Sequence, residues 1–441
     1  MEKNDKFNGT IIDINDDGDG VLKFNNEVIF IPNTWLNEEV EGIIINAKSK
    51  FAIGKVTTIK NESKHRIIPP CPYAYSCGGC TLQHITYDEQ LKFKEEKLKH
   101  IFKKVANIEI SPQNIVSGTN IRYRNKISLP VNEQLQIGLF RTNSHNILEI
   151  DDCLISKSWT KPLISAVKSY MIENNISGYN ERTKSGLVKH IVAREINDSV
   201  LISIVINGDT LPNSENLIAK LKPIFPSFGL NININKLHNN VILGSSFKHL
   251  YGLIELTATS DGLTYPVNNA SFLQVNNEVA NKIYDKVVSY IENSDVVINA
   301  YSGAGLLTAK LSNFAKTVYG IEIIKEATDS ANCLAKENNI SNMINICGDC
   351  TIEIPKLLKQ GIKNHIIVVD PPRKGCDNTV LDAILKSEPH KIIYVSCNPN
   401  TLARDIKILL QNNSYEIKEI TPFDMFPHTA HLETVVCLTK I

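Results

Sequence analysis

The stretch Val296-Val-Ile-Asn-Ala-Tyr-Ser-Gly-Ala-Gly305 decides the fold, because an apolar run leads directly into a turn that carries two glycines. Similar apolar runs recur at 317–322, 365–370 and 391–396, and they alternate with stretches of helical periodicity. Strands that are apolar on both faces are typical of a parallel sheet with helices on each side. The sequence therefore predicts a doubly wound, Rossmann-like α/β domain over residues 261–441.

Candidate ligand-binding residues follow these strands where parallel strands end. Gly303 and Gly305 follow the first strand, Glu322 closes the second and Asp370 ends the third. Ligands bind at this edge of open α/β sheets, where glycine lets the backbone come close and a carboxylate can accept hydrogen bonds from ribose hydroxyls. Thr308 replaces the third glycine of a dinucleotide fingerprint. The pattern favours S-adenosylmethionine, which has no phosphates, over NAD.

Two residues at the same edge suggest covalent chemistry. Cys397 follows the fourth strand in Ser396-Cys-Asn-Pro399, and Glu433 directly precedes another apolar strand. A thiol at a strand end is well placed to act as a nucleophile, and a partly buried carboxylate can act as a base. Uracil C5 becomes nucleophilic only after a nucleophile adds to C6, a step that suits a thiolate. The pair therefore fits methylation of uracil C5, although Glu433 could also be a solvated edge charge.

The remainder of the chain divides into four segments. Residues 1–60 read as short strands with Gly and Asp turns and predict a small OB-like barrel. Residues 61–85 contain a proline linker and a cysteine-rich segment. Residues 86–110 contain a helix that Thr86 and Glu89 begin in a capping-box pattern. Residues 111–260 alternate strands with one helix and predict an α+β middle domain.

Four cysteines form a candidate metal site. Cys71, Cys77 and Cys80 lie within ten residues, and Cys153 follows at a distance. Reduced cytoplasmic thiols rarely form structural disulfides, so ligation is the better explanation. Four thiolates suit either zinc or an iron-sulfur cluster, and zinc sites more often have two Cys-x-x-Cys pairs. The residues alone leave both metals open.

Composition limits the partners and the location. The 441 residues include 47 basic and 47 acidic residues, so net charge neither supports nor excludes a nucleic-acid partner. No apolar run is long enough to span a membrane, and the N-terminus lacks the apolar core of a secretion signal. We expect a cytoplasmic protein without a membrane or an obligate protein partner. Arg122, Tyr123, Lys126 and Arg141 are candidates for RNA contact, with a solvated basic strand as the alternative.

Together these motifs resemble the uracil-C5 RNA methyltransferases, and most of all the 23S ribosomal-RNA type with an N-terminal TRAM domain and an iron-sulfur cluster. The motifs are Ser271-Phe-Leu-Gln-Val-Asn276, Asp370-Pro-Pro-Arg-Lys-Gly375, Val395-Ser-Cys-Asn-Pro399 and Asp424-Met-Phe-Pro-His-Thr-Ala-His-Leu-Glu433. The resemblance implies that Cys397 is the nucleophile and Glu433 the general base. It also implies that the helix of residues 86–110 packs on the catalytic domain.

The resemblance further assigns two groups of ligands. The residues expected to contact S-adenosylmethionine are Gln274, Tyr301, Glu322 and Asp370. Those expected to hold a 4Fe-4S cluster, with a structural role, are Cys71, Cys77, Cys80 and Cys153.

Two other functions compete with 23S ribosomal-RNA methylation. The first is the same reaction on the T-loop uridine of transfer RNA, which we disfavour because that branch lacks both the barrel and the cysteine cluster. The second is an iron-sulfur RNA-binding protein without activity. That protein would be expected to lack Cys397 or Glu433, and both are present.

Overall fold

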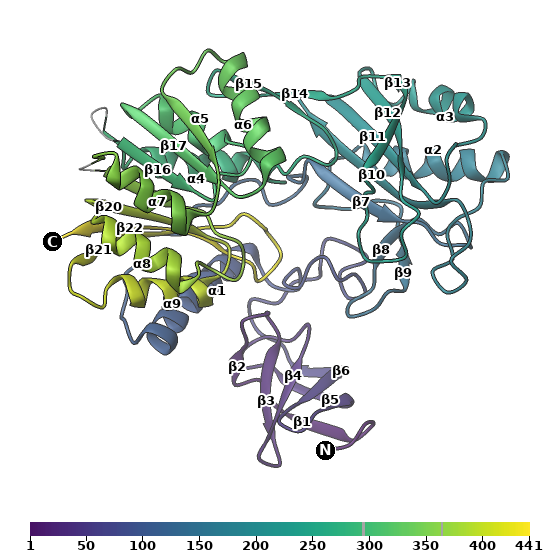
Figure 1. The fold of residues 1–441 in the computed structure, drawn as a ribbon. Coiled ribbons are helices and arrows are strands. Elements are labelled where there is room, and N and C mark those ends of the chain that lie inside the picture. Colours follow the sequence, from purple (N-terminus) through teal and green to yellow (C-terminus); the bar gives the residue numbers. More distant parts are fainter. Residues whose placement is uncertain (293–295, 363–364) are drawn as a thin grey trace.

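Three large β-sheets organise the computed structural model, which describes residues 1–292, 296–362 and 365–441 (Figure 1). The first has the strand order β1-β5-β6-β4-β3-β2, and only β4 and β6 pair in parallel. The Phe7 ring lies in the core of this sheet and packs against Gly42. Only glycine fits there, because a Cβ at Gly42 would lie 2.3 Å from the ring. The strands are β1 Lys6–Thr10, β2 Asp13–Ile14, β3 Gly20–Phe24, β4 Glu27–Ile31, β5 Glu39–Ala47 and β6 Ala52–Asn61.

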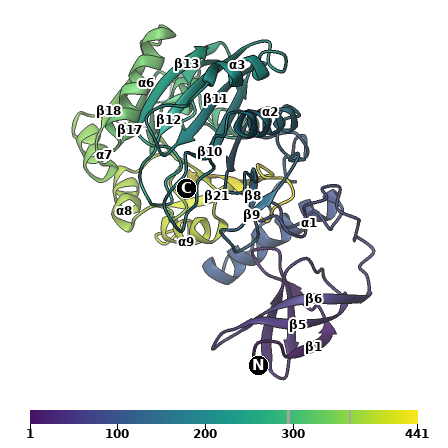
Figure 2. The ribbon, with the colours of Figure 1, turned by 90° about the vertical axis from the view of Figure 1, so that its right-hand side faces the viewer.

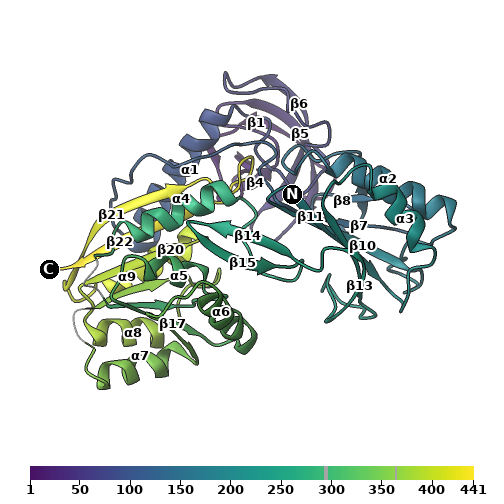
Figure 3. The same cartoon turned by 90° about the horizontal axis from the view of Figure 1, so that it is seen from above.

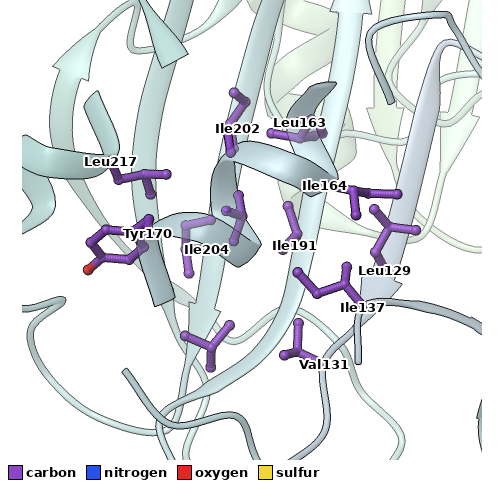
Figure 4. Close-up of a cluster of buried hydrophobic side chains, with 14 of the residues drawn as sticks. Leu129, Val131, Ile137, Leu163, Ile164, Tyr170, Ile191, Ile202, Ile204 and Leu217 are labelled. Carbon is purple, nitrogen blue, oxygen red and sulfur yellow. The ribbon is translucent and has the colours of Figure 1, made fainter. Parts of the chain in front are cut away.

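The second sheet belongs to the middle of the chain and has the order β13-β12-β11-β10-β7. Helices α2 and α3 cover one face, and Leu163, Tyr170 and Leu217 pack there on Ile191, Ile202 and Ile204 (Figure 4). Strands β8 and β9 form a separate pair, as do β14 and β15. The elements of this part of the chain are β7 Lys126–Pro130, β8 Gly138–Phe140, β9 Ile147–Glu149, α2 Thr160–Glu173, β10 Val188–Ile196, β11 Ser199–Ile206, α3 Ser214–Leu221, β12 Phe228–Ile234, β13 Ser246–Gly252, β14 Leu256–Ser260 and β15 Leu263–Val267.

The third sheet has the order β18-β17-β16-β19-β20-β22-β21. Its first five strands are parallel, and β22 is antiparallel to both β20 and β21. The strands are β16 Val296–Ala300, β17 Thr317–Glu322, β18 Met343–Cys347, β19 His365–Val369, β20 Lys391–Ser396, β21 Tyr415–Phe423 and β22 Glu433–Lys440. The helices are α4 Asn277–Val288, α5 Leu306–Ser312, α6 Lys325–Glu337, α7 Cys350–Lys359, α8 Asn378–Ser387 and α9 Pro399–Leu409.

Helices cover both faces of this sheet. On one face α7, α8 and α9 bury Ile354, Leu381 and Leu402 against the strands. On the other, α4 and α5 bury Ile283 and Leu311, and Figure 3 shows α4 beside β22. The predicted fold class, a doubly wound α/β domain with a small N-terminal barrel and an α+β middle domain, is confirmed.

One helix from the N-terminal part of the chain joins the third sheet's core. Helix α1 Tyr87–Ile101 continues as a π-helix, Phe102–Ala106, and lies between the barrel and the sheet (Figure 2). Leu98, Ile101 and Phe102 pack in the same core as α9. The side chain of Thr86 makes no capping hydrogen bond, so the capping box expected at the start of α1 does not form.

Within the described ranges, no helix has both the length and the apolar character that crossing a bilayer would require.

Candidate active site

The ends of β20 and β22 bring Cys397 and Glu433 to one place. The two strands pair antiparallel, with Ser396 opposite Thr434, so the residues that follow this pair at the sheet edge are Cys397 and Glu433. Asp370 follows β19, the parallel neighbour of β20, at the same edge. The hydrogen-bond register of the strands therefore brings Cys397 close to the carboxyl groups of Glu433 and Asp370.

The charges of these three groups influence one another, as expected for side chains that lie close together. The pKa of Glu433 is raised to about 8, mainly by burial and in part by Asp370, while Arg373 acts in the opposite direction. Burial also raises the pKa of Cys397 to about 11, with contributions from Glu433 and Asp370. Desolvation raises the pKa of Asp370 to about 7, although solvent reaches this residue, a combination that fits a carboxyl group in a recess.

The glycine turn after β16 is shaped for close approach. Tyr301, Gly303 and Gly305 all have positive φ angles, of 62°, 55° and 85°. A Cβ at Gly305 would lie 2.6 Å from Ala331, so α5 can pack on α6 only with glycine there, whereas Gly303 faces open space. Glu322 holds the turn from β17, because its Oε2 accepts a hydrogen bond from the Gly303 amide at 3.0 Å.

The other two predicted cofactor residues are Gln274, near the start of α5, and Tyr301, in the turn itself. Gln274 lines a small cavity together with Tyr284 of α4 and Leu306, the first residue of α5. Tyr301 is half-buried, and its hydroxyl faces the thiol of Cys376, which contributes to raising the tyrosine pKa. The structure thus gathers Cys397, Glu433 and Asp370 in one group and Glu322 with the glycine turn in another, along one sheet edge.

Arg373 is a charged residue of this site that sequence reasoning did not single out. It lowers the pKa of both Cys397 and Glu433, so its guanidinium lies near both. Its backbone is tied to the turn after Cys397, since its carbonyl accepts hydrogen bonds from the Asn398 side-chain Nδ2 at 3.0 Å and the Thr401 hydroxyl at 3.3 Å. The signal was present in the sequence, because an arginine directly after Asp370-Pro-Pro must lie at the same edge.

The four cysteines of the candidate metal site lie near one another. Cys77 is buried and Cys71, Cys80 and Cys153 are half-buried, and all four thiols are free. The thiols of Cys77, Cys80 and Cys153 have raised pKa values, mainly through burial and in part through the other thiols of the set. As the side chains stand, no group of three or more His, Cys, Asp or Glu residues in the described ranges is gathered to hold a metal ion.

Most candidate RNA-contact residues of the middle domain make contacts within the protein. Arg122 forms two hydrogen bonds with Asp152, at 2.9 and 2.6 Å, and another with the Cys153 carbonyl at 2.8 Å. Lys126 donates to the Asn269 carbonyl at 2.6 Å. Tyr123 is buried, and its hydroxyl lies 3.4 Å from the Pro427 carbonyl. These side chains support the protein's own structure, and Arg122 in particular orders the loop that carries Cys153.

Comparisons with known proteins agree with this geometry. The family model for tRNA (uracil-5-)-methyltransferases matches residues 86–441. An uncharacterized RNA methyltransferase of Staphylococcus epidermidis is 39% identical over an alignment 451 residues long. The alignment covers 100% of this chain and 98% of the relative. One from Staphylococcus aureus is 38% identical over 446 residues, which cover 99% and 98%.

A solved structure extends the similarity to the whole fold. The tRNA (uracil-54, C5)-methyltransferase of Pyrococcus abyssi, in complex with S-adenosyl-L-homocysteine, matches with a TM-score of 0.80 and 28% identity over 98% of this chain and 100% of its own. A match of that length includes the barrel, so our expectation that transfer-RNA enzymes lack it does not hold for this neighbour. The chain belongs to the uracil-C5 RNA methyltransferase family, whose methyl donor is S-adenosylmethionine.

Proposed function

We propose that this protein transfers a methyl group to C5 of a uridine in 23S ribosomal RNA, with Cys397 as nucleophile and Glu433 as general base. The observation that carries this proposal is the pairing of β20 with β22, which sets the thiol and the buried carboxyl side by side. S-adenosylmethionine, when bound, supplies the methyl group. Gln274, Tyr301, Glu322 and Asp370 are the residues proposed to bind it, since they lie along the same edge and beside the glycine turn.

In the proposed reaction, Cys397 gives up its thiol proton to solvent, and the resulting thiolate forms a bond from sulfur to C6 of uracil. The electron pair of the C5–C6 double bond then moves onto C5 and the neighbouring carbonyl group. Burial raises the pKa of Cys397, and the positive charge of Arg373 offsets part of that increase in favour of the thiolate. After C5 has taken the methyl group, Glu433 removes the C5 proton. The C6–S bond then breaks, and the electron pair returns to the sulfur, which releases the methylated base and the thiolate.

The choice of ribosomal RNA rests on the resemblance to the enzyme type that combines the barrel with four cysteines. A transfer-RNA uridine is the second candidate, because the Pyrococcus abyssi neighbour acts on uracil 54 of transfer RNA. In either case the target base must leave its stack to reach Cys397. We propose the barrel of residues 1–60 and the middle domain of residues 111–260 as the parts that hold the flanking RNA, with residues 261–441 as the catalytic domain.

Deletion of the gene is expected to remove 5-methyluridine from 23S ribosomal RNA and to leave transfer RNA unchanged. Nucleoside analysis of the two RNA fractions, from the deletion strain and from the same strain complemented with the gene, measures this directly. Loss of 5-methyluridine from transfer RNA alone would replace our substrate with the second candidate. No loss from either fraction would remove both.

We also propose that Cys71, Cys77, Cys80 and Cys153 hold a 4Fe-4S cluster. The donor set fits in kind, because four free thiols lie near one another; burial raises the pKa of Cys77, Cys80 and Cys153, and neighbouring thiols of the set raise it further. The side chains would have to rotate to bring the sulfurs together around the cluster, because in the described ranges they are not gathered as a metal-binding group. The addition reaction involves no electron transfer, so the cluster's role would be to order residues 61–85 and the loop that Arg122 holds.

Anaerobically purified protein is expected to be brown and to release both iron and sulfide in acid. Cys153→Ser should lower the iron content, whereas Cys333→Ser, at an exposed cysteine of α6, should leave it unchanged. A colourless protein that contains zinc would show that the four thiols bind a different metal.

A further inference from the structure

The loop that leads into Glu433 is held mainly by residues far from it in sequence. Residues 424–432 connect β21 to β22, and Glu433 is the first residue of β22. A base at the start of a strand is placed by two things, the strand's own pairing and the path of the loop before it. The contacts of the loop therefore bear on where the Glu433 carboxyl lies.

Helix α1 holds the beginning of this loop through a buried ion pair. Lys94 pairs with Asp424, and both side chains are fully buried. The Lys94 ammonium also donates to the Phe426 carbonyl at 3.1 Å, and the Tyr87 hydroxyl donates to the second oxygen of Asp424 at 2.6 Å. Removal of any one of these groups leaves a buried polar partner unsatisfied.

Gln90 joins the middle of the loop to the cysteine segment. This side chain is 1% exposed, and its Oε1 accepts a hydrogen bond from the His428 amide at 3.1 Å. Its Nε2 donates to the carbonyls of Leu82 and Ile85, at 2.9 and 2.8 Å. The amides of Thr81 and Leu82 in turn donate to the His428 carbonyl. One amide side chain thus links α1, the segment after Cys80 and the catalytic loop.

His428 needs such support because of its backbone conformation. Its φ angle of 67° lies in the left-handed region, where a residue other than glycine is strained and stays only if its surroundings fix it. Both its amide and its carbonyl are bonded to groups outside the loop. Further along, Lys97 donates to the Ala430 carbonyl at 2.9 Å and also bonds the Asp16 carbonyl of the barrel.

We propose that Gln90, with Lys97, is a positioning residue for the general base, so that α1 and the cysteine segment fix the loop that sets the Glu433 carboxyl. This inference rests on the proposed function of Glu433. It predicts a defect confined to one step, because addition of Cys397 and methyl transfer do not use the base, whereas removal of the C5 proton does. A displacement of about 1 Å can slow a chemical step by about 100-fold.

The test separates the two halves of the reaction. RNA that carries 5-fluorouridine stops after methyl transfer, because fluorine cannot leave as a proton, so the rate of covalent adduct formation reports on addition and methyl transfer without the step that uses the base. Release of methylated product from ordinary RNA in a single turnover reports on the base. Gln90→Met keeps the length of the side chain without its hydrogen bonds, and Lys97→Met is a second variant at a less buried position. Lys92→Met, on the exposed face of α1, is the matched control.

Gln90→Met and Lys97→Met are expected to slow product release by about 10- to 100-fold and to leave adduct formation close to wild type. The control should change neither rate. Equal loss of both rates, or normal release in both variants, would overturn the positioning role. If Gln90→Met does not fold, Lys97→Met decides the question. Failure of the wild-type protein to form the adduct would instead refute the proposed function, so the two failures are distinguishable.

Discussion

Cys397→Ala is expected to lower methyl transfer to RNA by about 10,000-fold or more, since loss of a covalent nucleophile removes the pathway itself. Without addition at C6, C5 of uracil lacks the electron density that attacks the methyl group. The rate is measured as incorporation of labelled methyl groups from S-adenosylmethionine. In the wild-type protein, 5-fluorouridine RNA and cofactor should give a complex that survives denaturing electrophoresis, and Cys397→Ala should give none.

A control variant at another cysteine distinguishes loss of the proposed nucleophile from a general effect of removing a thiol. Cys333 is an exposed cysteine of α6 in the same domain, and Cys333→Ala should keep both methylation and the covalent complex. A covalent complex that persists in Cys397→Ala would assign the nucleophile to another thiol. Absence of the complex from the wild-type protein would refute the addition mechanism altogether.

Glu433→Gln is expected to stop the reaction one step later. The amide has nearly the same shape but cannot accept the C5 proton, so turnover should fall by about 100- to 10,000-fold. Because addition and methyl transfer continue, the methylated adduct should accumulate with ordinary RNA, where the wild-type protein shows little. Glu416→Gln, at an exposed position of β21, is the control. Normal turnover in Glu433→Gln would remove this residue from its role.

The raised pKa of Glu433 gives this step a defined dependence on pH. The base works only as the carboxylate, and its pKa of about 8 means that the carboxylate fraction grows as pH rises toward that value. Single-turnover release should therefore accelerate by about tenfold per pH unit below pH 8 and level off above it. The same profile should be flat in Glu433→Gln. A release rate independent of pH in the wild-type protein would show that Glu433 does not titrate in this step.

The sequence allowed the shared position of the candidate residues at one sheet edge to be predicted, because short-range patterns determine it. Residues such as Cys397 and Asp370 follow apolar strands directly, and parallel strands end at one edge whatever the remainder of the fold does. The same logic identified Gly303 and Glu322, which the structure joins by a hydrogen bond. The fold class and the family were correct for this reason.

Contacts between distant parts of the chain could not be predicted in this way. Lys94 and Asp424 are 330 positions apart, and no local pattern indicates that a lysine in α1 is buried against a loop of the last hairpin. The charge of Arg122 suggested that it binds an RNA phosphate, yet its guanidinium forms an ion pair with Asp152 instead. Nor does the catalytic chemistry indicate which RNA is modified, because a uracil base is the same in every RNA.

The position of β22 bears on how activity arises during folding. This strand follows β21 in sequence but lies between β20 and β21, so it pairs with a strand on each side. Such non-local pairing closes a long segment of chain and is slow compared with helix formation. The proposed nucleophile Cys397 and the proposed base Glu433 come from the ends of the two strands that this pairing joins. We therefore expect the proposed catalytic pair to form only once β22 has paired with β20.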